Sequence, residues 1–242
     1  MADTISSFKK GVSDGIPIGL GYLSVSFAFG MMASSGGLPI WATIAISMTN
    51  LTSAGQMAGL GLILSGGSFI EMALTQLIIN IRYALMSLSL SQKLNSGVTF
   101  LHRLLISFGN TDEIFAVASS QSDEVGKKYM YGLITMPYLG WTAGTAIGAL
   151  AGQALPQSVC SALNIMLYGM FIAIFVPPAK TYSPVLKVVI IAIALSCAFA
   201  WMPGLNQISS GFVIIICTLI SAIFGAVFFP IESDTEGGGE NE

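Results

Sequence analysis

The chain has 242 residues, of which 54% are hydrophobic and 9% are charged, with a formal net charge of −3 and a mean hydropathy of +0.79. A soluble domain of this length would hardly stay in solution with so few charges, so the composition excludes an ordinary soluble protein. It predicts an integral membrane protein, with the lipid bilayer as its environment and no nucleic-acid partner.

Eight apolar segments follow one another, and most approach the ~20 residues with which a helix crosses ~30 Å of hydrocarbon. The runs are continuous, whereas strands of a membrane barrel alternate polar and apolar residues over about 10 positions. The predicted fold is therefore all-α, a polytopic transmembrane helical bundle. The segments cover residues 15–33, 38–64, 69–90, 104–119, 128–150, 158–176, 185–201 and 208–229.

The bundle is expected to occupy residues 13–230 as one transporter domain. Residues 1–12 are polar and do not resemble a cleaved signal, so we expect a short cytoplasmic N-terminal segment. The acidic, glycine-containing residues 231–242 predict a disordered cytoplasmic tail.

Helix starts are predicted from capping residues beside prolines. Ser13-Asp14 followed by Pro17, and Ser183 followed by Pro184, place a capping side chain next to a proline that the first turn tolerates. Ser68–Glu71 has the pattern of a capping box, which favours a capping role for Glu71 over a proton relay.

Basic residues predict the orientation of the chain, because lysine and arginine remain on the cytoplasmic side of short loops. If all eight segments cross, Lys93 and Arg103 face outward and the other six basic loop residues face inward. If segments 38–64 and 104–119 instead turn back, all eight basic loop residues face inward. Both versions place the two termini in the cytoplasm. The other six are Lys9, Lys10, Lys127, Lys128, Lys180 and Lys187.

Two of the apolar segments are interrupted by polar clusters, at residues 50–56 and 109–113. Segment 38–64 would make one helix of about 40 Å, too long for a simple crossing, so a broken or re-entrant element is favoured. Both clusters fall toward the bilayer centre, where exposed backbone groups of broken helices bind zwitterionic substrates. Interhelical hydrogen bonds are the alternative use of Thr52 and Ser53.

Charged residues inside the second cluster and in segment 69–90 indicate a polar interior. Asp112 and Glu113 are protonatable candidates for proton coupling, or first-turn acids of a half-helix that Asn110 caps. Arg82 needs a partner, which is one of these carboxylates or a substrate carboxylate, unless its side chain reaches the cytoplasmic interface.

The motifs around these residues resemble the AzlC/YgaZ family of branched-chain amino acid exporters. Asn80-Ile81-Arg82-Tyr83 is similar to the Asn-Leu-Arg-His element of the family, and residues 111–116 are similar to its Thr-Asp-Glu-x-Phe-Ala element. Gln56 matches the glutamine of its Ala-Gly-Ser-Ala-Gln-Phe stretch. The resemblance covers roughly residues 11–230. Tyr83 replaces the family's histidine, which removes a titrating group at that position.

The resemblance implies an inner-membrane secondary transporter that exports leucine, isoleucine, valine and sometimes methionine with a small AzlD/YgaH-type membrane subunit. The substrate is expected near mid-membrane, with proton coupling through Asp112 or Glu113. The candidate substrate-binding residues are Asn50, Thr52, Ser53, Gln56, Asn80, Arg82, Asn110 and Thr111.

Four glycines recur every fourth residue and line one face of a helix, where another backbone can approach closely. This face serves interior packing or a helical partner. The glycines are Gly140, Gly144, Gly148 and Gly152.

The sequence gives no indication of catalysis. It lacks the G-x-x-x-x-G-K-[ST] phosphate-binding loop, and Cys160, Cys197, Cys217 and His102 do not have the spacing of a metal site. We expect no enzyme activity, no cofactor and no metal. Two functions other than export remain open: a non-transporting membrane scaffold subunit, and a channel for small polar solutes.

Overall fold

The computed structural model describes residues 4–5, 7–154, 158, 172 and 176–230. The chain divides into two compact units, residues 1–172 and 173–242, which we treat separately. Most of the predicted segment 158–176, the predicted disordered tail 231–242 and Cys160 lie outside the described residues.

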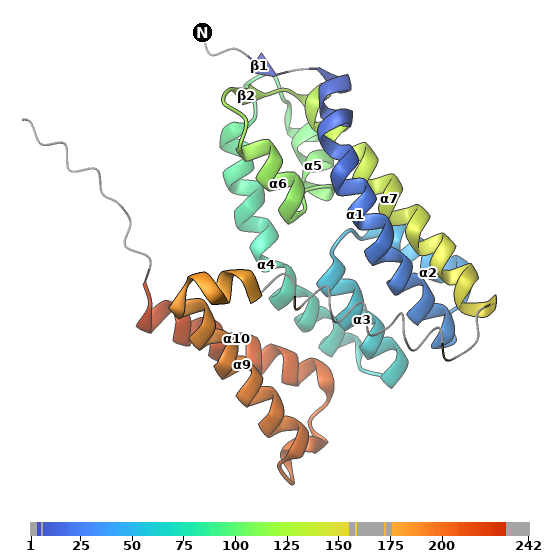
Figure 1. The fold of residues 1–242 in the computed structure, drawn as a ribbon, viewed down its shortest axis with the longest axis vertical. Helices are drawn as coiled ribbons and strands as arrows, with labels where there is room; N and C mark the ends of the chain where they lie inside the picture. Colours follow the sequence, from blue (N-terminus) through green and yellow to red (C-terminus); the bar gives the residue numbers. More distant parts are fainter. Residues whose placement is uncertain (1–3, 6, 155–157, 159–171, 173–175, 231–242) are drawn as a thin grey trace, which may run out of the picture. The chain divides into compact units, whose positions relative to one another are not determined.

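The described residues are almost entirely helical, which confirms the all-α prediction (Figure 1). Four of their helices, α1, α4, α9 and α10, are long and apolar enough to cross a membrane. Unit 1 contains β1 (Thr4–Ile5), α1 (Phe8–Ser35), α2 (Ile40–Thr49), α3 (Ser53–Ser65), α4 (Phe69–Lys93), α5 (Phe100–Phe108), α6 (Asp112–Ser119), β2 (Glu124–Val125) and α7 (Lys127–Ala154).

Helices α1 and α7 form the closest helix pair of unit 1, and they run in the same direction, side by side in Figure 1. A Cβ atom added at Gly11 would lie 2.2 Å from the carbonyl oxygen of Tyr129, and one added at Gly30 would lie 2.2 Å from that of Thr145. Backbones this close leave no room for side chains, so glycine on both helices is a packing requirement.

The regular glycines of α7 lie on this contact. Added Cβ atoms at Gly140 and Gly148 would lie 2.2 Å and 2.0 Å from carbonyl oxygens of α1, and one at Gly144 would lie 2.1 Å from Ser26 Oγ. Gly152 has more room, 3.0 Å from the carbonyl oxygen of Met31. In unit 1 the glycine face is therefore occupied by α1.

The prediction that Ser13 and Pro17 begin the first helix is wrong. Helix α1 begins at Phe8, where Ser7 accepts a hydrogen bond from the Lys10 amide, and Pro17 lies inside the helix. Pro137 lies inside α7 in the same way. Prolines are tolerated inside membrane helices because neighbouring helices and local adjustments satisfy the freed carbonyl.

Both segments predicted to be broken are broken. Residues 50–52 separate α2 from α3, and residues 109–111 separate α5 from α6. We call α2, the break and α3 hairpin 1, and α5, the break and α6 hairpin 2.

Each hairpin returns to the end of the unit from which it starts. An added Cβ at Gly36, just after α1, would lie 2.7 Å from Leu64 Cδ1 in the last turn of α3, so hairpin 1 begins and ends together. Hairpin 2 does the same at the other end, because the Asn95 amide donates to the carbonyl of Val125 at 3.0 Å. Strand β1 pairs there with β2.

Helix α4 connects the two ends and runs opposite to α1. It starts after hairpin 1, where Ser68 Oγ accepts a hydrogen bond from the Glu71 amide, as the capping pattern predicts. Glu71 is buried. Leu94, after its last turn, forms a bridge with Val125. Two helix–hairpin units of opposite direction, α1 with hairpin 1 and α4 with hairpin 2, thus precede α7.

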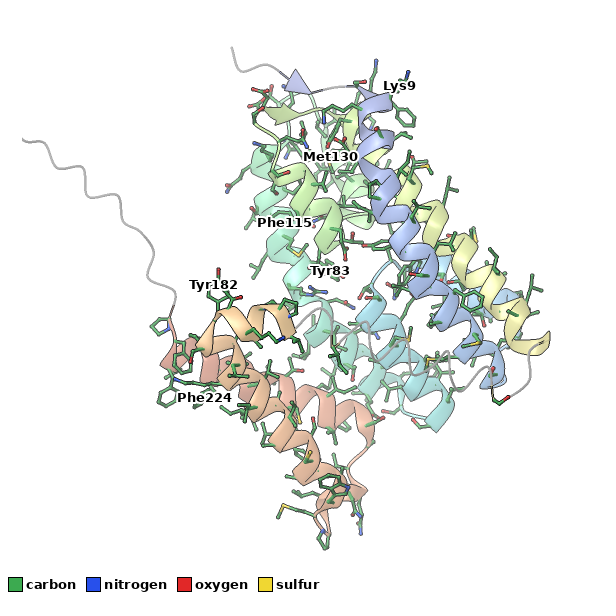
Figure 2. The ribbon with its side chains drawn as sticks, viewed as in Figure 1. Lys9, Tyr83, Phe115, Met130, Tyr182 and Phe224 are labelled. Carbon is green, nitrogen blue, oxygen red and sulfur yellow. The ribbon has the colours of Figure 1, made fainter. Side chains whose placement is uncertain are left out.

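The basic loop residues of unit 1 lie at the end that carries β1 and β2, and we call it the basic end. Lys9 lies in the first turn of α1 near β1 (Figure 2), and Lys93 ends α4. Arg103 donates to the Ser91 carbonyl at 2.7 Å, and Lys127 Nζ lies 3.2 Å from His102 Nε2. Lys93 and Arg103 therefore share one end with the other basic loop residues of unit 1, as the version with segments that turn back predicts.

Unit 2 contains α9 (Ser183–Trp201), the 3-10 turn η1 (Leu205–Gln207) and α10 (Ser210–Phe228). The helices are antiparallel, since an added Cβ at Gly225 near the end of α10 would lie 3.0 Å from Val188 Cγ2 near the start of α9. Gly204 turns the chain with a φ of 90°. Pro184 lies in the first turn of α9, but Tyr182 occupies the N-cap and no side chain caps the helix, so the predicted Ser183 cap is wrong.

The α1–α7 contact predicts an asymmetric response to added methyl groups. Gly148→Ala places a Cβ against the Phe27 carbonyl and should destabilise the protein by about 1–3 kcal/mol through overpacking. Gly21→Ala in α1 meets no atom within 4 Å and should be neutral or slightly stabilising. Thermal unfolding in detergent measures both, and equal unfolding midpoints would contradict the packing described.

Candidate functional site

A cavity of about 210 Å³ lies where the breaks of the two hairpins meet the middle of α4. Five of the predicted binding residues line it: Asn50, Thr52, Asn80, Asn110 and Thr111. The remaining lining residues, which the sequence did not suggest, are Thr49, Leu51, Tyr83, Ser107 and Phe108. Figure 2 labels Tyr83 midway along α4.

The break of hairpin 1 is held by side-chain hydrogen bonds. Asn50 Oδ1 accepts from the Thr52 amide at 2.9 Å, and Thr52 Oγ1 accepts from the Gly55 amide at 3.1 Å as the N-cap of α3. Thr52 also donates to Asn80 Oδ1 on α4 at 2.7 Å. Ser53 begins α3 and does not line the cavity.

A glutamine that the sequence did not suggest continues this network along α4. Asn80 Nδ2 donates to Gln76 Oε1 at 2.9 Å, and Gln76 Nε2 donates to the Gly55 carbonyl at 2.8 Å. Gln76 lies one turn before Asn80, and this i,i+4 spacing of two amides is the signal that could have revealed it.

The break of hairpin 2 contains a buried acceptor without a partner. Asn110 is 3% exposed, and its Nδ2 donates to Ser87 Oγ at 3.1 Å, whereas its Oδ1 has no hydrogen-bond partner. A buried amide oxygen on a cavity wall requires a donor, and a water molecule or a ligand supplies one. The prediction that Asn110 caps α6 is wrong, because Thr111 occupies the N-cap.

The two acids in the first turn of α6 have different partners. Arg82 binds Asp112, with Nη1 and Oδ1 2.5 Å apart, so a carboxylate of the chain is the partner that its position required. The guanidinium also lies 4.8 Å from the ring centroid of Tyr83. Glu113 instead accepts a hydrogen bond from the Tyr22 hydroxyl on α1. Neither Arg82, Asp112 nor Glu113 lines the cavity, so these charges flank it.

Tyr22 joins hairpin 2 to α1. Its side chain is buried, its hydroxyl donates to Glu113 and lies 2.6 Å from Thr111 Oγ1, and its ring packs edge-to-face on Trp141, with centroids 5.2 Å apart. A tyrosine within an apolar segment gives no indication of such a contact in the sequence, so Tyr22 could not be predicted as a site residue.

Gln56 is used for packing rather than for the first cavity. It is 2% exposed, donates to Ser47 Oγ at 2.9 Å and accepts from the Trp141 indole N–H at 2.8 Å. Ser47 in turn shares a hydrogen bond of 2.7 Å with Thr145. These bonds fasten hairpin 1 to α7.

A second, mainly apolar cavity of about 180 Å³ adjoins hairpin 1, and Asn50 lines both cavities. Its apolar walls come from α1, α2, α3 and α4. They include Phe29, Ile46, Leu60, Ile63 and Met72.

No group of three or more histidine, cysteine or acidic side chains with the proximity of a metal site occurs in the described part of the chain. The polar cavity therefore offers hydroxyl, amide and backbone groups, with one ion pair and one carboxylate beside it. Such groups bind a small polar or zwitterionic molecule.

The family model for the AzlC protein matches residues 17–155, which include both hairpins and α4. The chain belongs to the AzlC family. No solved structure matches it.

Three relatives are similar to this chain over most of its length. An uncharacterised membrane protein of Archaeoglobus fulgidus is 30% identical over 175 residues, covering 72% of this chain and 76% of the relative. The inner membrane protein YgaZ of Escherichia coli is 29% identical over 175 residues, covering 69% and 71%. The branched-chain amino acid transport protein AzlC of Bacillus subtilis is 24% identical over 174 residues, covering 71% and 67%.

The Arg82–Asp112 contact predicts non-additive mutational effects. Arg82→Gln leaves Asp112 unpaired, and Asp112→Asn leaves Arg82 unpaired, so the double variant Arg82→Gln/Asp112→Asn should lose less stability than the sum of the two single losses. A coupling free energy of about 0.5–3 kcal/mol is expected between residues in contact. Unfolding midpoints of the four proteins measure it, and strictly additive effects would show that the pair does not contribute.

Proposed function

We propose that this AzlC-family chain is the large subunit of a secondary transporter that exports leucine, isoleucine, valine and methionine. The observation that carries the proposal is the unpartnered Oδ1 of Asn110 on the wall of a polar cavity at the hairpin breaks. An amino acid's ammonium group is a donor that this oxygen can accept from. The name of the Bacillus subtilis relative, a branched-chain amino acid transport protein, supports the substrate class.

The two cavities fit the two ends of such a substrate. Asn110, Thr111 and Thr52 would hold the ammonium and carboxylate groups, since hydroxyls and amides at broken helices bind both. The aliphatic side chain would enter the apolar cavity beside Asn50, against Ile46 and Met72. Gln56 also lines this apolar cavity, whereas Ser53 would support hairpin 1.

We also propose which end of unit 1 faces the cytoplasm and which membrane holds the chain. The basic end of unit 1 would face the cytoplasm, according to the positive-inside rule, together with the two termini of the chain. The membrane would be the cytoplasmic, or inner, membrane, in agreement with the name of the Escherichia coli relative, an inner membrane protein. A small AzlD/YgaH-type membrane subunit would be the partner, and a proton the coupling ion.

Export of leucine and valine from cells that produce this chain with the small partner tests the proposal. Asn110→Ala removes the buried acceptor and should weaken transport about 10- to 100-fold, the equivalent of one hydrogen bond to a charged group. Asn206→Ala, at an exposed turn of unit 2, is the matched control and should be neutral.

The same assay separates the other functions. If the chain is a scaffold subunit, cells that produce it should export no leucine or valine at any membrane abundance. If it is a channel, small polar solutes should cross the membrane at a rate that added leucine does not reduce. Export by the parent chain that Asn110→Ala leaves unchanged would remove the hairpin cavity from the mechanism.

A further inference from the structure

Two neighbouring carboxylates in the first turn of α6 have contacts of opposite kind. Asp112 binds a guanidinium, and Glu113 binds a phenol. We infer that Glu113 is the group that binds and releases the coupling proton, and that Tyr22 is the positioning residue that holds it. This inference rests on the proposed function and decides which carboxylate carries the proton.

Asp112 is the fixed charge of the pair. The guanidinium of Arg82 stays protonated in proteins, and an unpaired cation halfway along a membrane helix is unfavourable. Protonation of Asp112 would leave Arg82 without the one ion-pair partner that it has in the described part of the chain. Asp112 therefore serves as the ion-pair partner of Arg82 and anchors hairpin 2 to α4.

Glu113 is free to change its charge. No lysine, arginine or histidine of the described residues forms an ion pair with it, and its side chain is exposed in unit 1, so a proton can reach it. Of the groups on the elements packed against α6, Tyr22 of α1 contacts it, and Arg82 and Tyr83 of α4 lie beside Asp112. The tyrosines of α7 bond elsewhere: Tyr129 to Asp14, Tyr131 to His102 and Tyr138 to the Met48 carbonyl.

A phenol is suited to hold a carboxyl in both protonation states. Tyr22 donates to the ionised carboxylate, and when Glu113 carries the proton, the same hydroxyl can accept from it and donate to Thr111 Oγ1, which lies 2.6 Å away. One proton binds to a Glu113 oxygen and leaves from it, the tyrosine keeps its own, and no buried group loses its partner.

The position of Tyr22 also links the proton site to the other hairpin. Its ring packs on Trp141, whose indole N–H donates to Gln56 of hairpin 1. Thr111, the second acceptor of the Tyr22 hydroxyl, lines the polar cavity. A change of charge at Glu113 therefore affects, through the contacts of Tyr22, both the cavity wall and the contacts that hold hairpin 1.

Inverted membrane vesicles from cells that produce the full chain with its small partner provide the first test. Leucine uptake driven by an acidic lumen requires proton movement, whereas exchange of labelled for unlabelled leucine does not. In Glu113→Gln the ratio of driven uptake to exchange should fall at least about tenfold, because an amide cannot carry the proton. Asp112→Asn should lower uptake and exchange together. Glu124→Gln, at the basic end, is the matched control.

Tyr22→Phe tests the positioning role through the pH profile. Tyr22→Phe removes the one hydroxyl that contacts the Glu113 carboxylate, so the midpoint of driven uptake should move along the pH axis if Tyr22 positions the proton site. A purely structural role would lower uptake at every pH without moving the midpoint. Tyr131→Phe, whose hydroxyl bonds to His102, is the control.

Infrared difference spectra of the purified chain between acidic and neutral pH give a readout that does not depend on transport. A protonated-carboxyl band that disappears in Glu113→Gln and persists in Asp112→Asn supports the inference, and the reverse pattern overturns it. The band without leucine transport would leave Glu113 as a proton site and refute the proposed function. Leucine transport whose proton dependence survives Glu113→Gln would retain the function and refute the inference.

Discussion

The free-energy cost of leaving backbone polar groups without a hydrogen-bond partner in the middle of the unit governs this structure. Residues 50–52 and 109–111 are not helical, so their backbone groups need other partners than the regular ones of a continuous helix: the amides of residues 109–111 bond to nearby carbonyls, and the Thr52 amide bonds to Asn50 Oδ1. Hydrocarbon offers none, and irregular backbone at that depth is tolerated only inside protein or beside a polar cavity. Thr52, Asn80 and Tyr22 supply side-chain partners to the two breaks.

The close contact of α1 and α7 is what brings these partners into place. Glycines on both helices allow the backbones to touch, and the touching pair carries Tyr22 and Trp141 to the level of the breaks. Leu51 of hairpin 1 packs in the same buried cluster as these two rings. A side chain in the α1–α7 contact would therefore displace the residues that satisfy the hairpins, as well as separate two helices.

The breaks could be predicted from the sequence, but their partners could not. Polar residues in the middle of an apolar segment are unfavourable unless they face a polar interior, so Asn50 and Asn110 marked the hairpins directly, and a carboxylate was the natural partner for Arg82. Tyr22 acts through contacts with residues far away in the chain, and nothing in its immediate neighbourhood in sequence indicates those contacts, whereas Gln76 could have been found only from its i,i+4 spacing to Asn80. The early start of α1 was missed because Pro17 suggested a first turn, whereas Ser7 already provides the cap.

The two helix–hairpin units run in opposite directions, and the cavity lies where their hairpin tips meet. Helix α1 leads to hairpin 1 at one end and α4 leads to hairpin 2 at the other, and the tips carry related residues, Ser47-Met48-Thr49-Asn50 and Ser107-Phe108-Gly109-Asn110. Repeats of opposite topology with broken helices that meet between them are the construction of many secondary transporters, with the substrate near the midplane. A scaffold needs no such meeting point. The cavity lies between breaks that enter from opposite ends of the unit, which is where the substrate of a transporter built in this way lies.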